Sequence, residues 1–167
     1  MANGPDINFV IRGTDNSTLI FVHGFACSLD DWEEQFRGLS PRFRCVALDL
    51  PGHRDSAKPE AISIEVMGTA VNRVKDQIAA PDTILVGHSM GCRVIVDAFQ
   101  QSRATVSGLV FVDGSFLGTD LQSAMKSIKA AIDHAGMDAF TQRFFRDMFL
   151  KAATPTSESG LSRALKT

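Results

Sequence analysis

Cysteine, net charge and long apolar runs are all scarce in this sequence of 167 residues. It has only three cysteines, Cys27, Cys45 and Cys92, and they are widely spaced. Their odd number and the lack of a Cys-x-x-Cys pair predict reduced, mostly buried thiols and a cytoplasmic location. No cluster of histidine and cysteine has the spacing of metal ligands, so we expect no metal and no cofactor.

The charge is nearly balanced, with 17 Lys and Arg against 19 Asp and Glu. No basic cluster stands out, which argues against nucleic acid or an anionic membrane as a partner. No run of about 18 apolar residues occurs, so no transmembrane helix is expected. The first 13 residues are polar and interrupted by Gly4 and Pro5, so they lack the apolar core of a signal peptide. The length suffices for one domain with a real core.

Short apolar runs alternate with amphipathic ones over the first two thirds of the chain. The runs rich in β-branched and aromatic residues predict strands at 7–13, 17–24, 43–53, 83–87 and 106–114. The stretches with helical spacing predict helices at 28–39, 63–80 and 89–102. This alternation predicts an α/β fold, a mostly parallel sheet flanked by helices. After Gly118 we expect only helices, at 119–136, at 137–153 and from 154 onward.

The segment Gly87-His88-Ser89-Met90-Gly91 joins one predicted strand to the next predicted helix. Glycines on both sides of Ser89 leave room for a sharp turn that exposes the hydroxyl, as in a nucleophile elbow. The helix start directs backbone N–H groups and the positive end of its dipole at a developing oxyanion. The simpler alternative is that Ser89 is a helix N-cap between two turn glycines.

Three stretches together resemble the α/β-hydrolase family: "FVHGFACSLDDWEEQF", "VALDLPGHRDSAKP" and "LVGHSMG". With the strand order, the resemblance covers residues 7 to about 115. It implies that Ser89 is the nucleophile and that the backbone N–H groups of Phe25 and Met90 form the oxyanion hole. It also gives structural roles in turns to His23, Asp49, His53 and His88.

Arg54 departs from the family pattern, since relatives often carry glycine at this position. If the backbone needs a positive φ there, arginine is strained at a modest cost. We expect its side chain to point outward and to pair with Asp55 or Glu60, which would contribute little to stability.

A catalytic acid and base are harder to find. The family order is serine, then an acid, then histidine. Asp113 closes a strand and is a candidate acid, although a strand-end aspartate more often caps a turn. His134 is the sole histidine after Ser89. It falls in the last turn of a predicted helix, where an imidazolium interacts favourably with the negative end of the helix dipole, so we expect no catalytic role. The simplest account is that the chain lacks its last third and, alone, is inactive.

The resemblance divides the chain into an α/β-hydrolase core at 1–117 and part of a helical cap at 118–167. It implies hydrolysis of an ester or related acyl substrate through an acyl-Ser89 intermediate. A small apolar acyl group would lie under Phe144, Phe145 and Met148, although these side chains could equally be core. Aspartate takes the elbow position in dehalogenases and epoxide hydrolases, so the serine argues against both.

Three alternatives remain open. Within the same fold, the chain could catalyse carbon–carbon bond hydrolysis or cofactor-free perhydrolysis. It could instead be a non-catalytic binding or interaction domain, or a half that a partner chain completes. Residues 106–112 would form an edge strand that is apolar on both faces, and such edges favour aggregation or dimerisation.

Overall fold

The computed structural model describes residues 6–114 and 121–149, without the side chains of 121–125, 145, 148 and 149. The chain forms two compact units, Met1–Phe116 and Leu117–Thr167. The strands of the first unit are β1 (Phe9–Arg12), β2 (Ser17–Val22), β3 (Arg44–Leu48), β4 (Asp82–His88) and β5 (Val106–Val112). Its helices are the 3-10 turn η1 (Leu29–Trp32), α1 (Glu33–Leu39), α2 (Ile64–Gln77) and α3 (Met90–Gln101).

The five strands form one sheet in the order β1-β3-β2-β4-β5. Strand β1 is antiparallel to β3, and every other pair is parallel. In the centre of the sheet, Ile20 lies opposite Val46 on one side and Leu85 on the other. The predicted α/β class and mostly parallel sheet are therefore confirmed. Parallel strands bring their carboxyl ends to one edge of the sheet, which is where ligands bind in open α/β folds.

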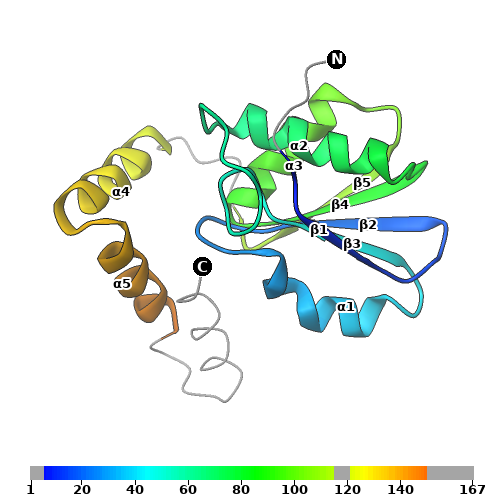
Figure 1. The fold of residues 1–167 in the computed structure, drawn as a ribbon, viewed down its shortest axis with the longest axis horizontal. Helices are drawn as coiled ribbons and strands as arrows, with labels where there is room; N and C mark the ends of the chain where they lie inside the picture. Colours follow the sequence, from blue (N-terminus) through cyan, green and yellow to red (C-terminus); the bar gives the residue numbers. More distant parts are fainter. Residues whose placement is uncertain (1–5, 115–120, 150–167) are drawn as a thin grey trace. The chain divides into compact units, whose positions relative to one another are not determined.

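Helices cover both faces of the sheet (Figure 1), with α2 and α3 on one side and α1 on the other. On the first side, Val71, Val74 and Ile95 pack against buried strand residues. On the other side, the rings of Trp32 and Phe36 lie 5.0 Å and 5.6 Å from the ring of Phe21. The parallel strands β2, β3 and β4 are thus buried from both faces, as their composition predicted, whereas β5 is intermediate to exposed along its length.

The helix predicted over 28–39 begins differently from the expectation. Ser28 is the N-cap, and its N–H donates to the carboxylate of Asp31 at 3.0 Å. The first turn is a 3-10 helix that ends at Trp32, which is the N-cap of α1 at φ −95° and ψ 8°. The indole of Trp32 is buried and packs on Phe21.

The second unit contains α4 (Leu121–Ala135) and α5 (Met137–Phe149), with Gly136 at φ 81° between them. The rings of Phe140 and Phe144 stack at 5.6 Å. The helix predicted from residue 154 and the side chains of Phe145 and Met148 lie outside the described residues. Among the helices of the described ranges, none has the length and apolar character that crossing a membrane requires.

Candidate active site

Ser89 lies at the turn between β4 and α3, in a conformation that L-residues rarely adopt. Its φ is 51° and its ψ is −115°, and the residue is exposed. Its backbone N–H donates to the carbonyl of Val112 at 3.1 Å, and its own carbonyl accepts from Cys92 N–H at the same distance. Such strain costs about 1–3 kcal/mol and persists where the surroundings over-determine it. The sharp turn and the exposure predicted for a nucleophile elbow are both present.

The glycines beside Ser89 allow backbones to approach closely. A Cβ on Gly91 would collide with the carbonyl oxygens of Val22 and His23, the latter at 2.7 Å. A Cβ on Gly87 would lie 2.8 Å from the nitrogen of Cys92. Both distances are below any real Cβ contact. The elbow therefore depends on glycine at both positions, and α3 begins directly against the end of β2.

Backbone strain gathers at the carboxyl ends of the parallel strands. Five described non-glycine residues have a positive φ, and four of them follow these strands. They are Ala26 after β2, Arg54 after β3, Ser89 after β4 and Asp113 after β5, with φ of 52°, 42°, 51° and 44°. Strained residues of this kind cluster at functional sites. The clustering marks this edge of the sheet as the candidate site.

The loop after β2 lies beside Ser89. A Cβ on Gly24 would lie 3.2 Å from the Cβ of Ser89 and 3.1 Å from Nδ1 of His88. Phe25 follows directly, so its backbone is close to the elbow. Met90 is the first residue of α3, and a helix's first N–H groups have no acceptor inside the helix. Two sources of backbone donors therefore flank Ser89.

His23 fixes the base of this loop and is almost fully buried. Its Nδ1 lies 2.8 Å from the carbonyl of Gly24, and its Nε2 accepts from Leu50 N–H at 2.9 Å. These partners require a neutral ring with the proton on Nδ1. Burial lowers the pKa of His23 to about 3. A ring held in this way joins two loops, and it agrees with the structural role expected for His23.

Asp49, which is fully buried, also links the loop after β3 to the segment that follows β2. One carboxylate oxygen accepts from Leu29 N–H at 2.9 Å, and the other accepts from the Asn8 amide at 2.7 Å. His53 turns back on its own loop, with Nδ1 3.3 Å from the carbonyl of Pro51. Burial lowers the pKa of His53 as well. The loops after β2 and β3 therefore form one hydrogen-bonded unit.

Arg54 pairs with Asp55, one of the two predicted partners, and has a closer partner that was not predicted. Its guanidinium contacts Asp30 at 2.5 Å, and Asp55 is more distant at 3.8 Å. Glu60 is not its partner among the described ion pairs. The contact with Asp30 is visible only in the tertiary structure, because 24 residues separate Arg54 from Asp30 in the sequence.

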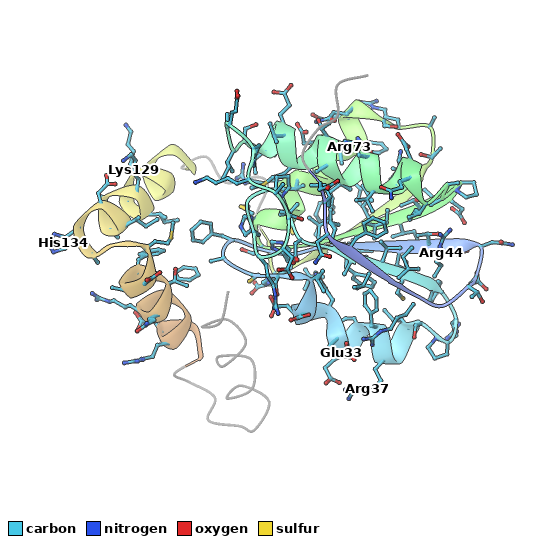
Figure 2. The ribbon with its side chains drawn as sticks, in the orientation of Figure 1. Glu33, Arg37, Arg44, Arg73, Lys129 and His134 are labelled. Carbon is cyan, nitrogen blue, oxygen red and sulfur yellow. The ribbon has the colours of Figure 1, made fainter. Side chains whose placement is uncertain are left out.

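The candidate acid and base are in different units. Asp113 is exposed and follows β5, and the neighbouring Gly114 lies against the backbone of Ser89, since a Cβ there would be 2.9 Å from the Ser89 carbonyl. His134 is exposed in the last turn of α4, the helical position predicted for it (Figure 2). Within residues 6–114, the Ser89 hydroxyl has no hydrogen bond to a histidine.

The three thiols are unpaired, and each has a raised pKa caused first by burial. For Cys27 the pKa rises to about 12, with the Asp31 carboxylate adding to the effect of burial. Across the described ranges, no three His, Cys, Asp or Glu side chains are grouped so that they could hold a metal ion.

Comparison with known proteins agrees with the fold. The family model described as alpha/beta hydrolase fold matches residues 17–164. The chain belongs to the alpha/beta hydrolase fold family. Solved members share the architecture: an esterase from Exiguobacterium antarcticum superposes with a TM-score of 0.84 over 98% of this chain, at 18% identity. An N-acyl homoserine lactone degrading enzyme gives 0.80 over 99%, at 21% identity.

Two curated proteins are similar in sequence to this alpha/beta hydrolase. The dihydrolipoyllysine-residue acetyltransferase component of the acetoin cleaving system of Cupriavidus necator is 34% identical over 66% of this chain. The 2-succinyl-6-hydroxy-2,4-cyclohexadiene-1-carboxylate synthase of Klebsiella pneumoniae is 32% identical over 77%. The chain spans 32% and 48% of these relatives, and 65% of the Exiguobacterium esterase.

Proposed function

We propose that this alpha/beta hydrolase acts by acyl transfer to water, with Ser89 as the nucleophile. The substrate is an ester or a related acyl compound with a small apolar acyl group. The observation that carries the proposal is the conformation of Ser89, exposed at φ 51° where a parallel strand meets a helix. Strain of this kind places a serine oxygen at the top of the sheet, where a substrate carbonyl can reach it.

The oxyanion that forms on attack would bind the backbone N–H groups of Met90 and Phe25. Two features support this assignment: Met90 opens α3, and Gly24 places the loop before Phe25 against Ser89. A preorganised pair of N–H donors stabilises the charge that develops in the transition state. The helix dipole of α3 adds to this stabilisation.

Ser89 also needs a base to take its proton and return it to the leaving group. His23 cannot take this role in the described geometry, since both of its ring nitrogens are hydrogen-bonded to the backbone. His53 is not hydrogen-bonded to Ser89 within residues 6–114, because its described hydrogen bond is to the carbonyl of Pro51. Asp113 directly follows Val112, whose carbonyl accepts from Ser89 N–H at 3.1 Å, so it remains the candidate acid. We therefore expect the 167-residue chain to be inactive by itself. The free thiols support a reducing compartment such as the cytoplasm.

An alternative within the family is carbon–carbon bond hydrolysis or cofactor-free perhydrolysis at the same serine. The similarity to a 2-succinyl-6-hydroxy-2,4-cyclohexadiene-1-carboxylate synthase supports this alternative, in which the substrate is not a simple ester. A non-catalytic binding domain, or a half completed by a partner chain, would use the same edge without turnover.

Two measurements test the proposal. Phenylboronic acid should give a tetrahedral ¹¹B NMR signal by bonding to the Ser89 oxygen, and Ser89→Ala should remove it. Short p-nitrophenyl esters should show no measurable turnover by the 167-residue chain, with or without Ser89→Ala. In a longer form that supplies an acid and a histidine, Ser89→Ala should abolish hydrolysis.

A wild-type protein that forms no boronate adduct contradicts the proposal. Ser89-dependent hydrolysis by the 167-residue chain would instead show that this chain contains its own base. Loss of that hydrolysis in His134→Ala would identify His134 as the base.

A further inference from the structure

Arg54 combines an unfavourable backbone conformation with a side chain that reaches another loop. Its φ of 42° lies in the left-handed region, where a side chain other than glycine is disfavoured. Its Nη1 donates to Asp30 at 2.5 Å and lies 3.4 Å from the hydroxyl of Ser28. Ser28 and Asp30 belong to the start of η1, which follows the loop after β2.

The segment that Arg54 contacts leads directly to the proposed oxyanion donor. Ser28 is 2% exposed and caps η1, and Cys27 N–H closes a turn onto the carbonyl of Gly24 at 3.3 Å. Residues 24–27 therefore form one tight turn that contains Phe25 and directly precedes Ser28. Movement of Ser28 would shift this turn relative to Ser89.

We propose that Arg54 is a positioning residue that holds the turn at residues 24–27 in place for the proposed reaction of Ser89. His23 and Asp49 join the loops after β2 and β3 from inside, through Leu50 N–H and Leu29 N–H. Arg54 joins them from outside, at a half-exposed ion pair with side-chain exposures of 39% and 45%. The inner bonds set the stability of the junction, and the outer pair limits the motion of the turn.

This division of roles predicts effects on local order rather than on overall stability. An ion pair of this exposure contributes up to about 1 kcal/mol, so its loss changes a local equilibrium by up to about fivefold. Cys27 lies in the turn and reports its opening without involving Ser89. Cys45 and Cys92 are fully buried and serve as internal controls in the same sample.

The experiment compares Arg54→Gly, Arg54→Lys and the matched control Arg12→Ala in the 167-residue chain. Arg12→Ala breaks an exposed pair with Glu33 of 2.8 Å that does not join the two loops. Alkylation of each cysteine is followed by peptide mass spectrometry, and phenylboronic acid affinity by ¹¹B NMR. Arg54→Gly should raise Cys27 alkylation and weaken the boronate adduct, each by up to about fivefold, with the urea midpoint lowered no more than in Arg12→Ala. In Arg54→Lys, the Cys27 alkylation rate and the phenylboronic acid affinity should both return most of the way to the wild-type values, because the ammonium can still pair with Asp30.

The two readouts separate this inference from the proposed function on which it rests. Unchanged Cys27 alkylation in Arg54→Gly overturns the positioning role, whatever Ser89 does. Equal changes at Cys27, Cys45 and Cys92 also overturn it, since they indicate global unfolding. Faster Cys27 alkylation with no boronate adduct in the wild type would contradict the proposed function and leave the ordering of the turn by Arg54 established.

Discussion

The Nε2 atom of His23 accepts a hydrogen bond from the backbone N–H of Leu50 at 2.9 Å, and both residues are buried. This bond joins the loop after β2 to the loop after β3. It exists only while the ring is neutral, because a protonated histidine has no acceptor. The junction beneath the proposed oxyanion donors therefore depends on the protonation of one side chain.

Acid should destabilise the protein through His23. Its pKa is about 3 in the folded protein and near 6.5 in the unfolded chain, so the unfolded state binds the proton first as the pH falls. Stability should decrease from pH 6.5 toward pH 3, by up to about 5 kcal/mol from this group. His53, whose pKa is also lowered, acts in the same direction. Urea unfolding at a series of pH values measures the slope.

The matched variants for this experiment are His23→Gln and His134→Ala. Glutamine cannot gain a proton, so its slope should be shallower, although it should be less stable at pH 7. His134 is exposed, and its removal should leave the slope as in the wild type. A His23→Gln protein with the wild-type slope would show that other groups cause the acid sensitivity.

Relief of strain at Ser89 should stabilise the protein. Glycine adopts a φ of 51° at a lower conformational cost than alanine, so Ser89→Gly should be more stable than Ser89→Ala by about 1 kcal/mol. Ser107 lies in β5 and has no positive φ, so there the order should be reversed, with Ser107→Ala more stable than Ser107→Gly. Chemical denaturation of the four variants tests both signs. Equal preferences at the two positions would exclude strain at the elbow.

Two glycine-to-alanine changes should act in opposite directions. Gly91→Ala places a Cβ against the backbone at the end of β2 and should cost more than about 2 kcal/mol. Gly38 lies in α1, and a Cβ there meets nothing within 4 Å. Gly38→Ala should therefore stabilise the protein by about 0.5–1 kcal/mol. Thermal unfolding distinguishes them, and a tolerated Gly91→Ala would contradict the close approach of α3 to β2.

The elbow should acidify a thiol placed at Ser89. Burial raises the pKa of every native thiol, so the wild type should be alkylated slowly at pH 8. Ser89→Cys adds an exposed thiol at the start of α3, where the helix dipole lowers a thiol pKa below about 8.5. The pH dependence of iodoacetamide alkylation measures this pKa. Ser107→Cys, exposed in a strand, is the control and should show an ordinary value.

The outer edge of β5 is the last test. Within residues 6–114 and 121–149, β5 pairs with β4 alone, and Val110 and Val112 are 45% and 38% exposed. We propose that the chain dimerises or aggregates through this strand, because an exposed apolar edge templates further pairing. Light scattering after size exclusion should show this, and Val110→Lys should reduce it. A wild-type monomer at all concentrations would contradict the proposal.

The amino-acid sequence by itself determined the fold class and the position of the elbow. Buried parallel strands need continuous apolar runs, as in residues 17–22, and a tight strand-to-helix turn needs the glycines at 87 and 91. These requirements are local, so they are readable from the order of residues. The positive φ of Ser89 follows from them.

Tertiary structure decided which distant residues meet at the site. Arg54 pairs with Asp30 and not with Glu60, because the junction of two loops brings together residues that are 24 apart. The bonds from Leu29 to Asp49 and from Leu50 to His23 likewise join different strand ends. Periodicity and motif spacing carry no information on such pairs, since the crossing of the chain at the sheet edge sets their distances.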